Sequence, residues 1–184
     1  MDYSRLLKKA SLAGAFFMSA IWLTAAQALC PAPDSLPVFA VQRVVDGDTL
    51  RLSDGRSVRM IGLNAPETGK KGRSAEPFAD AARRRLQSLV DENDGRVSLQ
   101  VGQEPKDHYG RTLANVYGRQ GENLEAQLLA EGLAYQVVIA PNVALLDCLQ
   151  RAERSARQAG LGVWRTSPVQ PVGKINSGGF ALIS

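Results

Sequence analysis

The chain has 184 residues, of which 45% are hydrophobic and 22% are charged. This composition is that of an ordinary globular protein, and it excludes a disordered chain, a collagen-like chain and a long coiled coil. Lysine and arginine outnumber aspartate and glutamate by 22 to 18, for a formal charge of +4. This small excess of positive charge does not by itself predict a nucleic-acid partner. Such a prediction depends on where the arginines lie.

Residues 1–28 have the pattern of an export signal. Basic residues between positions 5 and 9 precede an apolar run over residues 10–26, and Ala26 and Ala28 supply the small residues that a signal peptidase needs. The run is about 17 residues long, the lower limit for a membrane span, so an uncleaved signal anchor is the alternative. Cleavage after Ala28 predicts a periplasmic or secreted protein that is free of the membrane.

Two cysteines remain after the signal segment, Cys30 and Cys148. In an exported protein an even pair favours a disulfide, and two separate thiols are the alternative. No Cys-x-x-Cys spacing occurs, and His108 is the only histidine. A zinc site or a histidine-based catalytic site is therefore excluded, and the chemistry has to use carboxylates and arginines.

The predicted elements follow from periodicity and turn residues. Alternating apolar runs, separated by Asp-Gly turns, predict three strands, at residues 38–45, 49–52 and 57–63. Beyond a loop over residues 64–73, Ser74 is the expected N-cap of a helix that runs to about Leu89. Two more strands are expected at residues 95–101 and 112–117, and two more helices at residues 123–131 and 144–160.

Five short strands, with a helix between the third and the fourth, are typical of a barrel. The expected fold class is α+β and mainly β: a five-stranded Greek-key barrel of the OB type with three helices, over residues 38–165. Proline, glycine and serine dominate from residue 166 onward, so residues 166–184 are expected to form a tail. Its last seven residues are apolar, like a strand that lacks a partner.

Three polar clusters could carry chemistry. Asp46-Gly47-Asp48-Thr49 places two carboxylates at a strand-to-strand turn, although such quartets are often only turns. The second cluster, Asn64-Ala65-Pro66-Glu67, follows the strand that contains Arg59. The alternative for Arg59 is a solvated arginine on an edge strand. The third cluster, Asp107-His108-Tyr109-Gly110-Arg111, precedes the fifth strand, and Arg111 considered alone would be interpreted as a surface charge.

Together the clusters supply the groups that phosphodiester hydrolysis needs. Asp48 and Glu67 are hard oxygen donors, which suit Ca²⁺ or Mg²⁺. Arg59 and Arg111 are fork-shaped donors that match phosphate oxygens in pairs. A carboxylate can position or deprotonate water while the arginines stabilise charge in the transition state.

Over residues 41–164 the sequence resembles the micrococcal nuclease, or thermonuclease, family. The resemblance rests on the three clusters in this order, extended by Val58-Arg59-Met60-Ile61-Gly62-Leu63 before the second, and on similar stretches at residues 131–134 and 160–164. It implies an OB-type barrel with three helices. It also implies a Ca²⁺-dependent endonuclease, with Mg²⁺ as the alternative ion, that acts on DNA and RNA and leaves 3′-phosphates.

The same resemblance assigns roles to individual residues. Asp48 and the carbonyl of Ala65 would be metal ligands, and Glu67 would orient or deprotonate the attacking water. Arg59 and Arg111 would hold the phosphate and stabilise the transition state. The neighbouring residues Tyr109 and His108 would contact the substrate.

The sequence departs from the family pattern in two places. Asn64 stands where the family has a second carboxylate ligand, and its amide oxygen can coordinate but carries no charge, so cation affinity should fall. Of the tyrosines that stack on bases in the family, the stretch around residues 134–141 retains only Tyr135, which is offset.

The expected function is thus an exported, monomeric nuclease for which single-stranded nucleic acid is the preferred substrate. The alternative is an OB module that binds nucleic acid without cutting it, with Asn64 as the sign of lost activity. The presence of Glu67 favours the enzyme, because a binding module needs basic and aromatic residues but no catalytic carboxylate.

Overall fold

The computed structural model describes residues 30–69, 72 and 74–165. The expected signal segment over residues 1–28 and the expected tail over residues 166–184 lie outside these residues. Among the helices that are described, none combines the length and apolar character needed to cross a bilayer.

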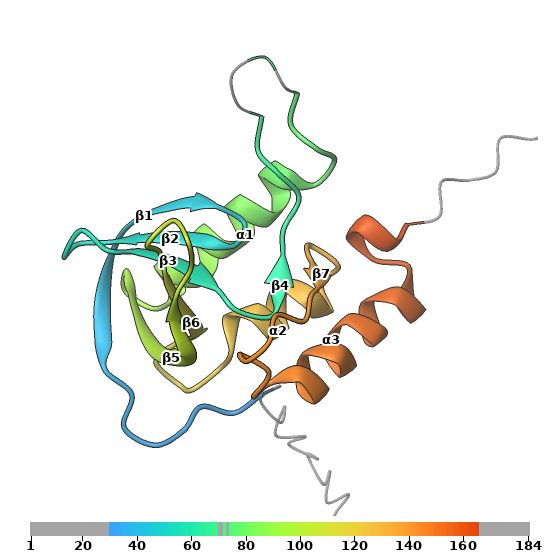
Figure 1. Ribbon diagram of the computed structural model, residues 1–184. Coiled ribbons are helices and arrows are strands. Elements are labelled where there is room, and N and C mark those ends of the chain that lie inside the picture. The colour runs from blue at the N-terminus through green and yellow to red at the C-terminus, as the bar shows by residue number, and fades with distance from the viewer. Residues whose placement is uncertain (1–29, 70–71, 73, 166–184) are drawn as a thin grey trace, which may run out of the picture.

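A closed barrel forms the centre of the described structure (Figure 1). Its strands follow one another in the spatial order β1-β2-β3-β6-β5. β3 and β6 are parallel, and the other neighbours are antiparallel. This confirms the expected five-stranded barrel. The strands are β1 (Val38–Asp46), β2 (Thr49–Leu52), β3 (Ser57–Met60), β5 (Arg96–Lys106) and β6 (Thr112–Tyr117).

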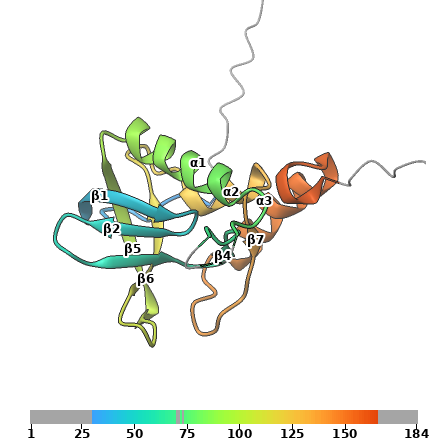
Figure 2. The ribbon, with the colours of Figure 1, turned by 90° about the horizontal axis from the view of Figure 1, so that it is seen from above.

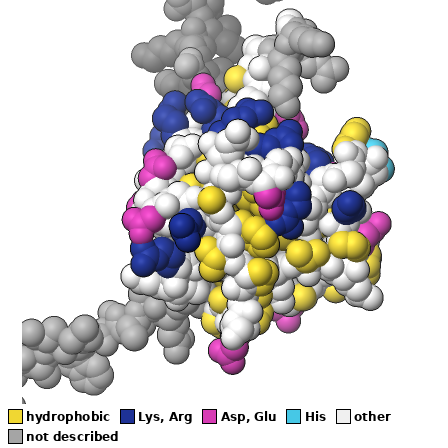
Figure 3. All heavy atoms as spheres, turned by 90° about the vertical axis from the view of Figure 1, so that its left-hand side faces the viewer, with side chains coloured by type: hydrophobic (Ala, Val, Ile, Leu, Met, Phe, Trp, Pro, Cys, Tyr) yellow, Lys and Arg dark blue, Asp and Glu magenta, His cyan; other side chains and the backbone are white. Residues whose placement is uncertain are grey.

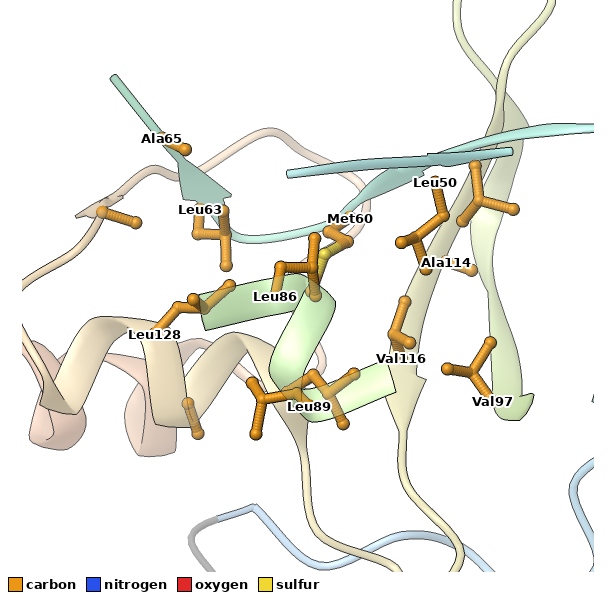
Figure 4. Packing of buried hydrophobic residues seen from close by; sticks show 14 of the residues in the cluster. Leu50, Met60, Leu63, Ala65, Leu86, Leu89, Val97, Ala114, Val116 and Leu128 are labelled. Atoms are coloured by element: carbon orange, nitrogen blue, oxygen red, sulfur yellow. The ribbon is translucent and has the colours of Figure 1, made fainter. Parts of the chain in front are cut away.

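Alternation along the strands separates the core from the outer face. Leu50 and Leu52 on β2 are fully buried, as is Val58 on β3. Successive side chains of a strand point to opposite faces, so Arg51 and Arg59, which lie next to these residues, face out of the barrel. Figure 4 shows Leu50, Met60, Ala114 and Val116 pointing into the same interior.

The third strand is shorter than the sequence predicts, which corrects the expected range of 57–63. β3 ends at Met60, and Gly62 has a φ of +81°, a left-handed backbone that few other residues adopt. The chain then forms β4 (Leu63–Asn64), which pairs with β7 (Tyr135–Gln136) in a separate two-stranded sheet. Neither element of this small sheet was predicted from the sequence.

The described residues contain three α-helices, as expected: α1 (Ala79–Glu92), α2 (Leu124–Ala130) and α3 (Leu146–Ala159), followed by the 3₁₀ turn η1 (Gly162–Trp164). Ser74 is not the N-cap of α1. The helix begins after Phe78, whose φ is 69° and whose side chain makes no cap hydrogen bond. Asn123 does cap α2, where its side chain accepts a hydrogen bond from the Ala126 N–H.

The helices cover one side of the barrel and extend away from it. α1 packs against β1, and α2 lies between the barrel and α3 (Figures 1 and 2). Leu86 and Leu89 of α1 point toward the barrel strands, and Leu128 of α2 lies beside them (Figure 4). A disulfide joins Cys30 to Cys148 with a Cα–Cα distance of 5.6 Å, so the segment before β1 is tied to α3.

Candidate active site

The turn between β1 and β2 places Asp48 beside the segment that follows β4. A Cβ atom at Gly47 would lie 2.6 Å from the Cβ of Ala65 and 2.7 Å from the Cβ of Ala82, so there is no space for a side chain. Glycine therefore permits the turn, Ala65 and α1 to approach one another closely. As a result Asp48, from the first cluster, is buried against Ala65, from the second.

Three groups hold the Asp48 carboxylate. The Thr49 hydroxyl donates to Oδ1 at 3.0 Å, and the Ala65 N–H donates to Oδ2 at 2.9 Å. Nη1 of Arg59 lies 3.1 Å from the same Oδ2 in an ion pair. The structure thus brings together Asp48, Arg59 and Ala65, which come from three separate segments of the chain.

Burial raises the pKa of Asp48 to about 6, even though the positive charge of Arg59 opposes the shift. The neighbouring Asp46 adds to it through charge repulsion, and its Oδ1 accepts a hydrogen bond from the Asp48 N–H at 3.2 Å. The attraction of Arg59 therefore does not offset the cost of burying the ionised carboxylate, and a cation beside Asp48 would favour its ionised form.

Arg59 connects Asp48 to Asn64. Its Nη2 donates to Oδ1 of Asn64 at 3.0 Å, and its Nη1 donates to the Met60 carbonyl at 3.0 Å. The amide oxygen that the resemblance assigns to a metal ion is thus hydrogen-bonded to an arginine in this structure.

Arg59 and Arg111 line one pocket of about 390 Å³, which His108 also lines. Leu113 and Ile139 form an apolar part of the pocket wall. Arg59, from the strand before the second cluster, and Arg111, from the third cluster, therefore meet at this pocket, where guanidinium groups can bind a phosphate.

Asp107 positions Arg111. Its Oδ2 accepts from Arg111 Nε at 2.6 Å, and its Oδ1 accepts from the backbone N–H groups of Tyr109 and Arg111. Although burial opposes the shift, the hydrogen bonds from Arg111 lower the pKa of Asp107 below its usual value. No sequence motif assigned a separate role to Asp107, although an Asp four residues before an Arg is a usable signal.

Tyr109 lies at the surface beside this pair, with 73% of its area exposed. Its ring centroid is 3.7 Å from that of His108 and 5.5 Å from the Arg111 guanidinium carbon. An exposed aromatic ring next to an arginine is suited to contact with a flexible nucleic-acid strand.

Within the described residues, the Glu67 side chain forms no hydrogen bond or ion pair with this group. Its side chain is exposed, and its backbone N–H donates to Oε2 of Glu76 at 2.9 Å. The Glu76 N–H donates in turn to the Glu67 carbonyl, which closes the base of the loop between them.

Asn142 is a pocket residue that the sequence analysis missed. Its Oδ1 accepts from the Glu104 N–H at 2.9 Å, and its Nδ2 donates to the Glu104 carbonyl at 3.1 Å. Both residues line the same pocket as Arg111. These hydrogen bonds attach the segment after β7 to β5, and no local pattern in the sequence signals a contact over that distance.

The donor atoms near Asp48 suit a hard cation. Asp48, Asn64 and the Ala65 backbone offer only oxygen atoms, which Ca²⁺ and Mg²⁺ prefer. In the described part of the chain, His, Cys, Asp and Glu side chains form no cluster of three or more that could hold a metal ion. The residues therefore fit a cation with few charged ligands, whose remaining ligands are neutral oxygens.

Two arginines in one pocket, beside a buried carboxylate on an OB-type barrel, are suited to a class of proteins that bind phosphate groups. Residues 57–166 match the family described as staphylococcal nuclease homologue, which agrees with this class. The chain belongs to this family, which is a family of nucleases. The resemblance noted from the three clusters is thereby confirmed.

Individual relatives support the same assignment. The chain is 36% identical over 129 residues to a thermonuclease of Staphylococcus intermedius, a match that covers 68% of this chain and 75% of the relative. It is 34% identical over 129 residues to the SPbeta prophage-derived endonuclease YokF of Bacillus subtilis, covering 67% of this chain and 43% of the relative. Endonuclease YncB of Bacillus subtilis is 33% identical over 132 residues, covering 69% of this chain and 61% of the relative. The chain thus spans less than two thirds of both Bacillus proteins.

Proposed function

We propose that the protein is an exported endonuclease that hydrolyses phosphodiester bonds of DNA and RNA, requires a divalent cation, and leaves 3′-phosphate ends. One observation carries the proposal: Arg59 contacts the buried carboxylate of Asp48 and also lines the pocket that contains Arg111. Ca²⁺ is the proposed ion and Mg²⁺ the alternative, because the ligand atoms are oxygens.

The two arginines bind the scissile phosphate. Guanidinium groups pair with phosphate oxygens through two parallel hydrogen bonds, and they stabilise the extra negative charge of a five-coordinate transition state. Asp107 keeps Arg111 in place for this role through the hydrogen bond to Nε. Because Nε is already used, the Arg111 terminal nitrogens remain for the phosphate.

Glu67 is the proposed group that orients or deprotonates the attacking water. It follows Ala65 by two residues, and its backbone pairing with Glu76 holds the ends of the loop together. Its exposed carboxylate is accessible to solvent water, from which the nucleophile comes.

Asp48, Asn64 and the carbonyl of Ala65 would hold the cation, which when bound polarises a phosphate oxygen. Asn64 has a double role in this scheme, because its Oδ1 accepts from Arg59 Nη2. If Asn64 gave this oxygen to a cation, Nη2 of Arg59 would be left to donate to the substrate phosphate.

His108 and Tyr109 are proposed to contact the nucleic acid next to the cleaved bond. The Tyr109 ring is exposed, and bases of a single strand can stack on such a ring, whereas bases in a duplex are already stacked. Single-stranded substrate is therefore preferred, and one barrel with its pocket is sufficient, so the protein acts as a monomer.

The experiment is a cleavage assay on plasmid and on single-stranded DNA, with Ca²⁺ and then with EDTA. The purified protein should cut both substrates with Ca²⁺ and neither with EDTA, and the new 3′ ends should be sensitive to phosphatase. Glu67→Gln should bind DNA but cut it slowly, whereas Asp147→Asn, which neutralises an exposed carboxylate on α3, should behave as the original protein. Binding without cleavage under every cation would instead identify a nucleic-acid-binding module.

A further inference from the structure

Two arginines with like charge lie directly opposite each other on the barrel surface. In the antiparallel pairing of β1 and β2, Arg43 faces Arg51. Residues directly opposite share one face of a sheet, and like charges there repel each other and destabilise the pair. Repulsion between the two guanidinium groups therefore lowers the stability of the fold locally.

No acidic side chain in the described part of the chain forms an ion pair with Arg43 or Arg51. Arg51 donates only to the Gly55 carbonyl, at 2.8 Å. The nearby acids have other partners, because Asp54 binds Arg56 and Asp46 accepts from the Asp48 N–H. Most of the positive charge of the two arginines is therefore left for an external anion.

A third arginine, Arg59, extends this group of basic side chains toward the pocket. Arg51 is opposite Ser57 in the pairing of β2 with β3, and Arg59 follows two residues later on the same outer face. We call the side chains of Arg43, Arg51 and Arg59 the arginine row. The row crosses three adjacent strands, which are about 4.8 Å apart, and ends at the pocket that contains Arg111.

Figure 3 views the molecule from the side on which the turn between β2 and β3 projects. Lys and Arg side chains appear in several groups over this side, with fewer Asp and Glu side chains between them. Basic side chains therefore gather on the side of the barrel from which the turn between β2 and β3 projects.

We propose that Arg43 and Arg51, the two members of the arginine row that lie beyond the pocket, form a second binding site for the phosphodiester backbone, used by the part of a long strand that extends beyond the pocket. The inference rests on the proposed function for its ligand. Guanidinium groups bind successive phosphates without reading bases, so the site would add affinity for long strands of any sequence.

The test uses binding rather than cleavage, so that it stands apart from the proposed activity. Affinity for a long fluorescent oligothymidylate and for a thymidine trinucleotide is measured in EDTA at several salt concentrations. Each phosphate contact with a single strand contributes about 0.7 to the slope of log K against log salt. Arg43→Gln with Arg51→Gln should therefore lower the slope for the long strand by about 1.4, and each single change by about half of that.

Arg151→Gln with Arg154→Gln is the matched control, because both arginines are exposed on α3 and the same charge is removed. This control should keep the original slope. The Arg43 and Arg51 double variant should melt no lower than the original protein, because it removes a repulsion. The proposal is overturned if the slope for the long strand stays the same, if the trinucleotide loses as much affinity as the long strand, or if the control loses as much slope. Failure of the original protein to cut any nucleic acid would count against the proposed function but would leave this comparison intact.

Discussion

Nη1 of Arg59 lies 3.1 Å from Oδ2 of Asp48, and the two side chains are only 14% and 9% exposed. Attraction between opposite charges at this separation is stronger in a partly buried setting than in water. The proposed phosphate-binding arginine is therefore positioned by the proposed metal-binding carboxylate. A change in either residue should disturb both functions.

The arginines in the pocket should act mainly on the transition state. Arg59→Lys or Arg111→Lys keeps the charge but removes the fork of donors, so each should lower kcat by roughly 10²-fold and change KM much less. Steady-state kinetics on a single-stranded substrate would measure both constants. Arg154→Lys on the surface of α3 is the control. Turnover close to that of the original protein would remove the changed arginine from the mechanism.

Asn64→Asp should strengthen the cation site. The change adds one negative charge at nearly constant shape, and charged ligands raise Ca²⁺ affinity, so half-maximal activation should occur at a several-fold lower Ca²⁺ concentration. Activity is measured against Ca²⁺ at fixed substrate and ionic strength. Gln120→Glu, at an exposed position in the turn after β6, adds the same charge elsewhere. An unchanged Ca²⁺ requirement would mean that Asn64 serves only as the partner of Arg59.

Asp107 is a positioning residue, and changing it should lower activity because Arg111 is then held less firmly. In Asp107→Asn an amide replaces the carboxylate that accepts from Nε, so the guanidinium loses a charge-assisted hydrogen bond. We expect Asp107→Asn to lower kcat about tenfold in the original protein. In a protein that already carries Arg111→Lys, the same change should lower kcat much less. Additive losses in the double variant would show that Asp107 does not act through Arg111. Asp94→Asn, which breaks the exposed pair with Arg119, is the control.

The disulfide between Cys30 and Cys148 should contribute strongly to stability. It spans 118 residues of sequence, and restricting so long a loop in the unfolded chain is worth about 4–5 kcal/mol in the chain-entropy description. Urea unfolding with and without reductant would measure the difference. Thiol titration of the unreduced, denatured protein should detect no free sulfhydryl, and two free thiols would contradict the pairing.

Glu125 should make the protein less stable as the pH rises. Burial raises its pKa from 4.5 to about 8, although the Val116 N–H and the Asn123 side chain donate hydrogen bonds to its carboxyl. Between these two pH values the unfolded chain loses a proton that the folded chain keeps. The free energy of unfolding should therefore fall by about 1.4 kcal/mol for each pH unit that lies within this window.

Glu125→Gln cannot titrate, so it isolates this contribution. Urea unfolding of both proteins between pH 5 and pH 8 should show the original protein losing stability relative to the variant as the pH rises. A constant difference across the range would mean that the buried carboxyl keeps an ordinary pKa.

The sequence by itself determined that five strands form a barrel, and it supplied most of the candidate site residues, although β3 ends earlier and β5 ends later than expected. Alternation of apolar and polar residues is visible in a short stretch of sequence, and so are turn residues. The predicted bounds of β2 and β6 therefore agree with the structure at both ends. The same locality identified Asp48, Arg59 and Arg111 as candidates, because each lies in a short motif of polar residues at the end or centre of a predicted strand.

Only the tertiary structure decided how these residues meet. The pairing of β4 with β7 depends on the turn at Gly62 and on packing against α3, and a two-residue strand has too little periodicity to be predicted. The hydrogen bond between Arg59 and Asn64 depends on the turn at Gly62 that lies between them. The pocket shared by Arg59 and Arg111 depends on the parallel pairing of β3 with β6. No tight turn joins two parallel strands, so local sequence does not specify this pairing.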